Sequence, residues 1–198
     1  MTCDGDVTKR VTYVRREEPA VVLFARVDDP AAGPGSDLCG QMPLHVAAEI
    51  CRWGVRLVCV SRSPAAYIRQ VQCELGIVEP FICDGGAAVH VPNRYVAATE
   101  PLDHRVECKF EIFRFSPPDR AAAVTLVRDL FVANCRGEPV TIGIGCDCDD
   151  YGVLAVVDIP IVVRDAVNDQ SMLMRHIPGV YVTSATGSEG WAEALRGP

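Results

Sequence analysis

Residues 140–163 read VTIGIGCDCDDYGVLAVVDIPIVV, and this stretch indicates the fold class. The apolar run VTIGIG at 140–145 leads into an acidic loop. DDYGVLAVV at 149–157 then predicts a short helix, and DIPIVV at 158–163 is a second apolar run. Two short apolar runs joined through a helical segment are typical of a βαβ unit with parallel strands.

The same alternation of apolar runs and helical segments extends to both sides of this stretch. Strands are expected at 20–27, 55–60, 80–83, 109–115, 140–145, 158–163 and in VYVT near the C-terminus. Helices are expected at 42–54, 63–76 and 117–137, with short ones in QSMLMRHIPG and at the end of the chain. DGGAAVHVP at 84–92 indicates a turn with a hairpin, Ser63 is expected to cap the helix that follows it, and Asp119 lies at the entry of 117–137. The pattern predicts an α/β fold: a Rossmann-like three-layer sandwich with a mainly parallel sheet and helices on both faces.

Composition and charge limit the classes of protein that the sequence can encode. With 198 residues, 49% of them hydrophobic, we expect an N-terminal arm at 1–18 and a single core domain at 19–198. The net charge of −7 argues against a nucleic-acid or anionic-membrane partner. No apolar stretch reaches the roughly 20 residues of a membrane helix. The ten cysteines are scattered and the first residues are polar, which favours reduced thiols in a cytoplasmic protein.

Four pieces of the sequence together resemble one enzyme superfamily. They are ELG-I-x-x-PFI-x-x-GG-A at 74–87, G-x-G-x-x-x-x-D at 143–150, the run AVVDIPIVV, and TGSEGWAEAL near the C-terminus. This combination resembles the haloacid dehalogenase superfamily and, within it, the mannosyl-3-phosphoglycerate phosphatase group. The resemblance implies a Rossmann-like core and Mg²⁺-dependent hydrolysis of phosphate esters through an aspartyl-phosphate. In such a sheet the site lies at the carboxyl ends of the strands, so the loops after residues 27, 60, 83 and 145 are the candidates.

The first motif of the superfamily is altered at its most important position. The first predicted strand ends in FARVDDP at 24–30, where the resemblance places the nucleophilic aspartate at Arg26 and the acid/base aspartate at Asp28. A guanidinium stays protonated, so Arg26 cannot attack phosphorus and would repel a metal ion. Moving the register to make Asp28 the nucleophile puts Pro30 at the acid position.

The remaining motifs are also altered. The phosphate-binding hydroxyl position falls on Val60, with Ser61 one residue later, and the lysine position holds Arg120. In the loop at 145–150, the first metal-binding aspartate is replaced by Cys146 and the last is retained as Asp150. A neutral thiol is a poor ligand for Mg²⁺, which prefers oxygen.

These replacements predict a non-catalytic pseudophosphatase that binds a phosphorylated ligand or a protein. No cofactor is expected; Mg²⁺ would be needed if the protein were active, and the alternative function is an altered or weak Mg²⁺-dependent phosphatase of sugar phosphates. The expected ligand-binding positions are Arg26, Asp28, Ser61, Arg62 and Arg120. The degenerate metal positions are Cys146, Asp147, Asp149 and Asp150.

Three interpretations of these residues stay open. In the first, Arg26 neutralises Asp28, Asp147 and Asp150 in an ion-pair network that keeps the old pocket folded. In the second, Arg26 and Arg120 hold a phosphate or sugar phosphate without cleaving it. In the third, Cys146 and Cys148 belong to a soft-metal site, although a C-x-C pair alone is a weak zinc signal.

The segment at the usual position of a cap domain is short. Only residues 92–116 occupy the gap between the two halves of the core, which is enough for a hairpin or loop and not for a domain. We therefore expect the cap to be absent or reduced to a hairpin. A second copy of the chain or a protein partner would then cover the open strand ends, and apolar residues of AAVHVP and YVAATEPL are expected to be exposed for that contact.

Overall fold

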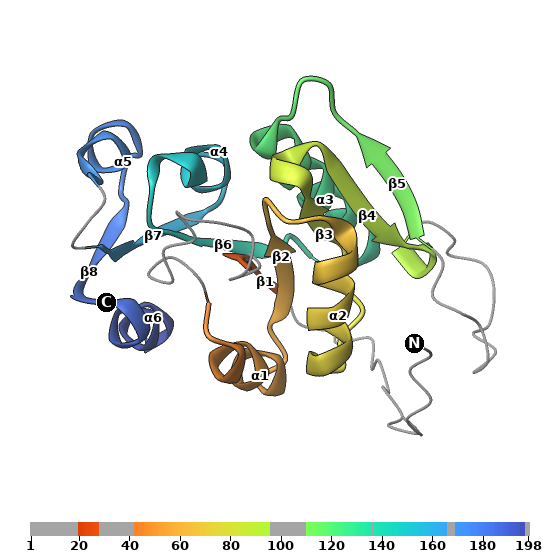
Figure 1. Ribbon diagram of the computed structural model, residues 1–198, viewed down its shortest axis with the longest axis horizontal. Helices are drawn as coiled ribbons and strands as arrows, with labels where there is room; N and C mark the ends of the chain where they lie inside the picture. Colours follow the sequence, from red (N-terminus) through yellow and green to blue (C-terminus); the bar gives the residue numbers. More distant parts are fainter. Residues whose placement is uncertain (1–19, 28–41, 96–109, 136, 166–168, 197–198) are drawn as a thin grey trace.

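The computed structural model describes residues 20–27, 42–95, 110–135, 137–165 and 169–196. The predicted arm at 1–18, Asp28 and most of the insert at 92–116 therefore lie outside the described residues. Within them, eight strands form one sheet in the order β5-β4-β3-β2-β1-β6-β7-β8 (Figure 1). The strands are β1 Val21–Arg26, β2 Arg56–Val60, β3 Phe81–Cys83, β4 Ala88–Pro92, β5 Phe110–Arg114, β6 Val140–Gly145, β7 Ile159–Arg164 and β8 Tyr181–Thr186.

Helices cover both faces of this sheet, which confirms the predicted three-layer α/β fold (Figure 1). One face carries α1, α2 and α6, and the other carries α3, α4 and α5. Their bounds are α1 Leu44–Arg52, α2 Ala65–Leu75, α3 Arg120–Asn134, α4 Tyr151–Leu154, α5 Ser171–His176 and α6 Gly187–Arg196. Three short 3₁₀ turns are η2 Asp84–Gly86, η3 Asn93–Tyr95 and η4 Cys148–Asp150.

The sheet is mainly parallel, with one antiparallel extension. Strands β3, β2, β1, β6, β7 and β8 are parallel to one another, whereas β4 pairs antiparallel with both β3 and β5. Strand β1 is central, and its side chains alternate between the two apolar layers. Leu23 and Ala25 pack toward α1 and α2, and Val22 and Phe24 pack toward α3. Burial on both faces explains why residues 20–27 form a continuous apolar run.

Two local expectations are wrong. Ser63 does not cap α2, because Pro64 is the N-cap residue and supplies no side-chain cap; the Ser63 amide instead donates to Ser61 Oγ at 2.9 Å. Residues 88–92 are buried and not exposed, because β4 lies between β3 and β5. In contrast, Asp119 caps α3 as a helix-entry residue should, accepting a hydrogen bond from the Ala122 amide at 2.9 Å.

None of the described helices combines the length and the apolar character that crossing a bilayer requires.

Candidate site at the carboxyl ends of the strands

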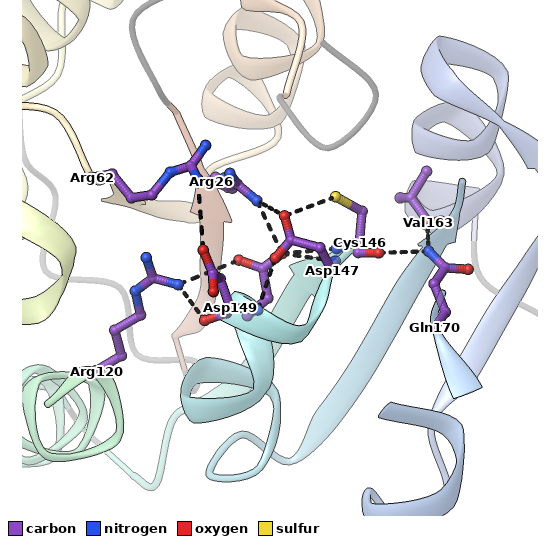
Figure 2. Close-up of polar contacts among 9 residues, drawn as sticks. Arg26, Arg62, Arg120, Cys146, Asp147, Asp149, Val163 and Gln170 are labelled. Carbon is purple, nitrogen blue, oxygen red and sulfur yellow. Dashed lines mark hydrogen bonds and ion pairs between the residues drawn. The ribbon is translucent and has the colours of Figure 1, made fainter. Parts of the chain in front are cut away.

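Arg26 is the last residue of the central strand, and its guanidinium lies in the middle of the candidate site. Its side chain is buried, with 7% of the residue exposed. Nη1 donates a hydrogen bond to Asp147 Oδ2 and lies 3.6 Å from Asp150 Oδ2 (Figure 2). Strand β1 pairs with β6 in parallel, so the loop after Gly145 emerges beside the end of β1. The sheet topology thereby brings one arginine to two carboxylates more than a hundred residues away in the chain.

The loop after β6 folds around the carboxylate of Asp150. Its Oδ2 accepts hydrogen bonds from the amides of Cys146 at 2.8 Å and Asp147 at 3.3 Å. Asp147 in turn accepts from the Asp149 amide at 2.9 Å, which completes a reciprocal cap of turn η4. Gly145 makes the close approach possible, because a Cβ added there would lie 2.5 Å from Asp150 Cβ.

Arg120 opens helix α3 and reaches the same loop from the other side. It donates from Nη1 to the carbonyl oxygen of Asp149, and the same atom lies 4.0 Å from Asp150 Oδ1. The start of α3 is held against the turn after β3, since the Asp119 amide donates to the Gly86 carbonyl at 3.3 Å. A Cβ on Gly86, whose φ is +98°, would lie 2.8 Å from Arg120 N. A glycine in the GG pair after β3 is therefore needed to place Arg120.

Arg62 and Ser61 come from the loop after β2. The Nη1 of Arg62 lies 3.6 Å from Asp149 Oδ2, and both side chains are substantially exposed, at 40% and 51%. Ser61 is buried, and its amide donates to the Ile82 carbonyl at 2.9 Å. The structure thus gathers Arg26, Arg62, Arg120, Asp147, Asp149 and Asp150 into one network of alternating charge (Figure 2).

Burial and neighbouring acids control the protonation of two groups in this network. Burial, reinforced by Asp150 and Asp147, raises the pKa of the Cys146 thiol far above its usual range, so the thiol is neutral. Burial, followed by the charge of Asp147, also raises the pKa of the Asp150 carboxyl. Arg26 and the two loop amides oppose that second shift by stabilising the carboxylate.

The ligand atoms of Cys146, Asp147 and Asp150 lie within 4.8 Å of one another, close enough to surround an ion. Their chemistry does not fit Mg²⁺, because one of the three is a neutral thiol and both carboxylates face the Arg26 guanidinium. A structural zinc site needs four ligands, and no fourth one joins this group within the described residues. Cys148, the second cysteine of the predicted soft-metal interpretation, is exposed and is not part of the group.

One contributor to the site was missed by the sequence reasoning. Gln170 is buried, and its Nε2 donates to the carbonyls of Cys146 and Val163, each at 2.7 Å (Figure 2). This side chain fastens the loop after β6 to strand β7. A single glutamine in a polar stretch before a short helix carries no pattern that would have indicated this role. Asp28, which was predicted to lie here, is outside the described residues.

The fold is a three-layer α/β sandwich, and the comparisons with known proteins confirm the predicted resemblance to haloacid dehalogenase-like and mannosyl-3-phosphoglycerate phosphatase proteins. The structure is similar to a haloacid dehalogenase-like hydrolase protein from Bacillus subtilis, with a TM-score of 0.52, 12% identity, and coverage of 91% of this chain and 89% of that chain. It is also similar to a Thermoplasma acidophilum protein, with a TM-score of 0.54, 11% identity, and coverage of 90% of this chain and 98% of that chain. No protein-family model matches the chain.

In sequence, the chain is similar to a glucosyl-3-phosphoglycerate/mannosyl-3-phosphoglycerate phosphatase of Persephonella marina. The two are 24% identical over 232 aligned residues, which span 74% of this chain and 86% of that protein. The alignment of 232 residues is longer than this whole chain of 198 residues, although it covers only 74% of the chain. The relative therefore has residues within the aligned region that have no counterpart here.

Proposed function

We propose that this chain is a non-catalytic haloacid dehalogenase-like domain, a pseudophosphatase that holds its acidic site with arginine instead of Mg²⁺ and binds a phosphorylated ligand. The observation that carries the proposal is the position of Arg26. Its guanidinium contacts Asp147 and lies 3.6 Å from Asp150, so part of the negative charge that a metal would neutralise is already offset.

Hydrolysis through an aspartyl-phosphate requires a carboxylate at the end of β1. In this chain that residue is Arg26, which has no lone pair available for attack on phosphorus. Its charge is buried against two acids, and removing it would leave buried Asp150 with only the loop amides and the more distant Arg120 among the contacts described above. Both effects support a protein that has lost the chemical step and kept the fold.

Binding of an anion is supported by the outer part of the network. Arg62 faces Asp149, and a solvent-exposed pair at 3.6 Å contributes little to stability. A phosphate group offers several charged oxygens and can replace the single carboxylate of Asp149. Arg120 lies on the other side of the same residue, through its contact with the Asp149 carbonyl. Phosphate or a sugar phosphate is therefore the ligand class that we propose.

The short insert at 92–116 bears on whether a cap domain could cover such a ligand. The relative from Persephonella marina carries residues within the aligned region that this chain lacks, which supports the absence of a cap domain. With the strand ends open, a second copy or a protein partner at this face is part of the proposal.

Two measurements test the proposal. Titration calorimetry with Mg²⁺, alone and with beryllofluoride, should give no binding heat for the natural chain. The variant Arg26→Asp/Cys146→Asp restores two carboxylates and should gain Mg²⁺ binding, whereas the matched Cys146→Ser replaces one neutral group by another and should gain none. Millimolar phosphate should raise the melting temperature of the natural chain and have less effect on Arg62→Ala. An absent phosphate effect would contradict ligand binding without bearing on the loss of catalysis.

The alternative function is a weak or altered Mg²⁺-dependent phosphatase of sugar phosphates. It is favoured by the name of the sequence relative and by the grouping of Cys146, Asp147 and Asp150 ligand atoms within 4.8 Å. Saturable Mg²⁺ binding by the natural chain, strengthened by beryllofluoride, would establish this alternative and reject the pseudophosphatase.

A further inference from the structure

Strand β5 forms one edge of the sheet and is exposed. It stands at one end of the strand order, and in the described part of the chain it pairs with β4 alone (Figure 1). Glu111, Ile112 and Arg114 are exposed, and Ile112 is 46% exposed. A strand edge of this kind presents backbone N–H and C=O groups that can pair with another strand.

The pairing of β5 with β4 determines which of its backbone groups point outward. The Phe115 amide donates to the Ala87 carbonyl at 2.9 Å, and the register continues antiparallel from Ala88 opposite Arg114. Hydrogen-bonded and non-hydrogen-bonded pairs alternate along an antiparallel ladder. Residues 111, 113 and 115 therefore direct their backbone groups toward β4. Residues 110, 112 and 114 direct theirs away from the sheet.

We propose that β5 is a self-association surface whose partner is β5 of a second copy of this chain, paired antiparallel about a twofold axis through Ile112. A twofold axis perpendicular to a sheet places residues of equal parity opposite each other, so residues 110, 112 and 114 form the new hydrogen-bonded pairs. This register uses all three outward-facing residues of β5. A shift by two residues in either direction would leave one of them unpaired.

The side chains support a second copy as the occupant, because FEIFR is complementary to itself in this register. Ile112 would pack on Ile112 of the partner subunit, and Phe110 would lie opposite Arg114 of the partner subunit. The Phe110 ring already accepts a guanidinium, since Arg69 Cζ lies 5.8 Å from its centroid. Glu111 and Arg114 have opposite charges, so pairing two copies brings together strands without net charge.

The competing interpretation is that the charged side chains of Glu111 and Arg114 guard the edge against association. The two interpretations predict different oligomeric states. They also differ at Ile112, which contacts Ile112 of the partner subunit only if the twofold dimer forms. The proposal is independent of the proposed function, because β5 contributes none of the contacts of the candidate site.

Sedimentation velocity over a series of micromolar to millimolar concentrations is the test. The natural chain should show a reversible monomer–dimer equilibrium of moderate affinity, as expected for a small interface. The Ile112→Pro variant lacks an outward N–H group that does not pair with β4. This variant should be monomeric. Ile112→Thr keeps that N–H and should still dimerise. Circular dichroism melting of each variant separates loss of association from loss of folding.

A pair of charge variants tests the axis itself. Ile112→Lys and Ile112→Glu should each be monomeric, because like charges would meet across the axis, and an equimolar mixture should form a heterodimer. A natural chain that is monomeric throughout the series would overturn the proposal. Dimers that persist in Ile112→Pro and Ile112→Lys, or charge variants that fail to associate when mixed, would overturn it as well.

Discussion

Two acid-containing clusters lie at opposite ends of the parallel strands of the sheet, and they are built differently. At the amino ends, Glu79 is a single buried acid that accepts hydrogen bonds from Arg56 Nη1 at 2.9 Å and from the Tyr95 hydroxyl. At the carboxyl ends, Asp147 and Asp150 both face Arg26. In the first cluster one acid, Glu79, accepts from an arginine and a hydroxyl, and in the second two acids share Arg26.

The number of acids distinguishes a cluster with one paired acid from a cluster in which two acids are crowded together. A structural polar cluster places each buried acid with its own partners, because an unpaired buried charge is costly. Burial raises the pKa of the Asp150 carboxyl, and repulsion by the nearby Asp147 raises it further. Arg26 offsets part of this repulsion, because its guanidinium contacts Asp147 and lies 3.6 Å from Asp150.

The largest expected effect is the loss of Arg26. Arg26→Ala removes the shared partner of buried Asp150 and half-buried Asp147 and should lower the free energy of unfolding by about 3–5 kcal/mol. Arg56→Ala should cost about half as much, because Glu79 keeps the Tyr95 hydroxyl and Arg56 is partly exposed. Urea unfolding of both variants measures the contrast. Adding Asp150→Asn to Arg26→Ala should recover part of the loss; equal losses for the two arginines would remove the distinction between the clusters.

A smaller effect is expected from crowding the loop that holds Asp150. Gly145→Ala would place a Cβ 2.5 Å from Asp150 Cβ and should cost about 1–3 kcal/mol as the loop shifts. Gly76→Ala is the matched control, because its Cβ meets nothing within 4 Å and only its φ of +66° is unfavourable. Thermal unfolding should show about 1 kcal/mol for that control. A Gly145→Ala variant as stable as Gly76→Ala would mean that the loop is not tightly packed.

Asp149→Asn separates ligand binding from stability at the exposed side of the site. The substitution removes the carboxylate that faces Arg62 while keeping the size of the side chain. Stability should change by less than about 0.5 kcal/mol, and phosphate should bind more tightly because one competitor for the arginine is gone. Glu138→Gln is the control, since Glu138 forms a similar exposed pair with Arg128 at 3.6 Å. Phosphate titrations in which both variants behave alike would argue against a role for Arg62.

The smallest effect is expected at Glu193, whose hydrogen-bond donors are an uncharged hydroxyl and uncharged backbone amides. The hydroxyl of Tyr181, followed by the amides of Ser184 and Ala185, lowers the pKa of Glu193 from 4.5 to about 2. A depressed carboxyl pKa contributes stability that is present above the unfolded pKa and is lost as the pH falls from about 4.5 to about 2. Nuclear magnetic resonance titration should find this low pKa and a higher one in Tyr181→Phe. An unchanged value in that variant would show that the hydroxyl is not the main cause.

The expected elements of secondary structure are present in the described residues because their signals are local. The runs at 140–145 and 158–163 became β6 and β7, and the Asp119 entry became the N-cap of α3. The spacing of apolar residues and their preference for burial are properties of consecutive residues, so both can be assessed from a sequence. The burial of β4 was mispredicted because it depends on β5, a strand that joins it from 18 residues further along the chain.

Several residues of the candidate site were proposed from motif positions, and their contacts were not. The resemblance placed Arg26 and Cys146 at positions where the superfamily has acids, and this placement led to an expected ion-pair network. Which acids Arg26 contacts, the carbonyl that Arg120 reaches and the link made by Gln170 come from the structure. These contacts join distant segments over a few ångströms, and no local pattern encodes such distances.

By itself, the sequence determined the α/β class, the superfamily resemblance and the presence of an arginine at the end of β1, since each depends on residue types in order along the chain. Only the tertiary structure decided that one guanidinium serves two carboxylates and that the outward backbone groups of β5 belong to residues 110, 112 and 114. The physical reason is that charge balance and hydrogen-bond direction depend on distance and register, which the packing of the sheet sets.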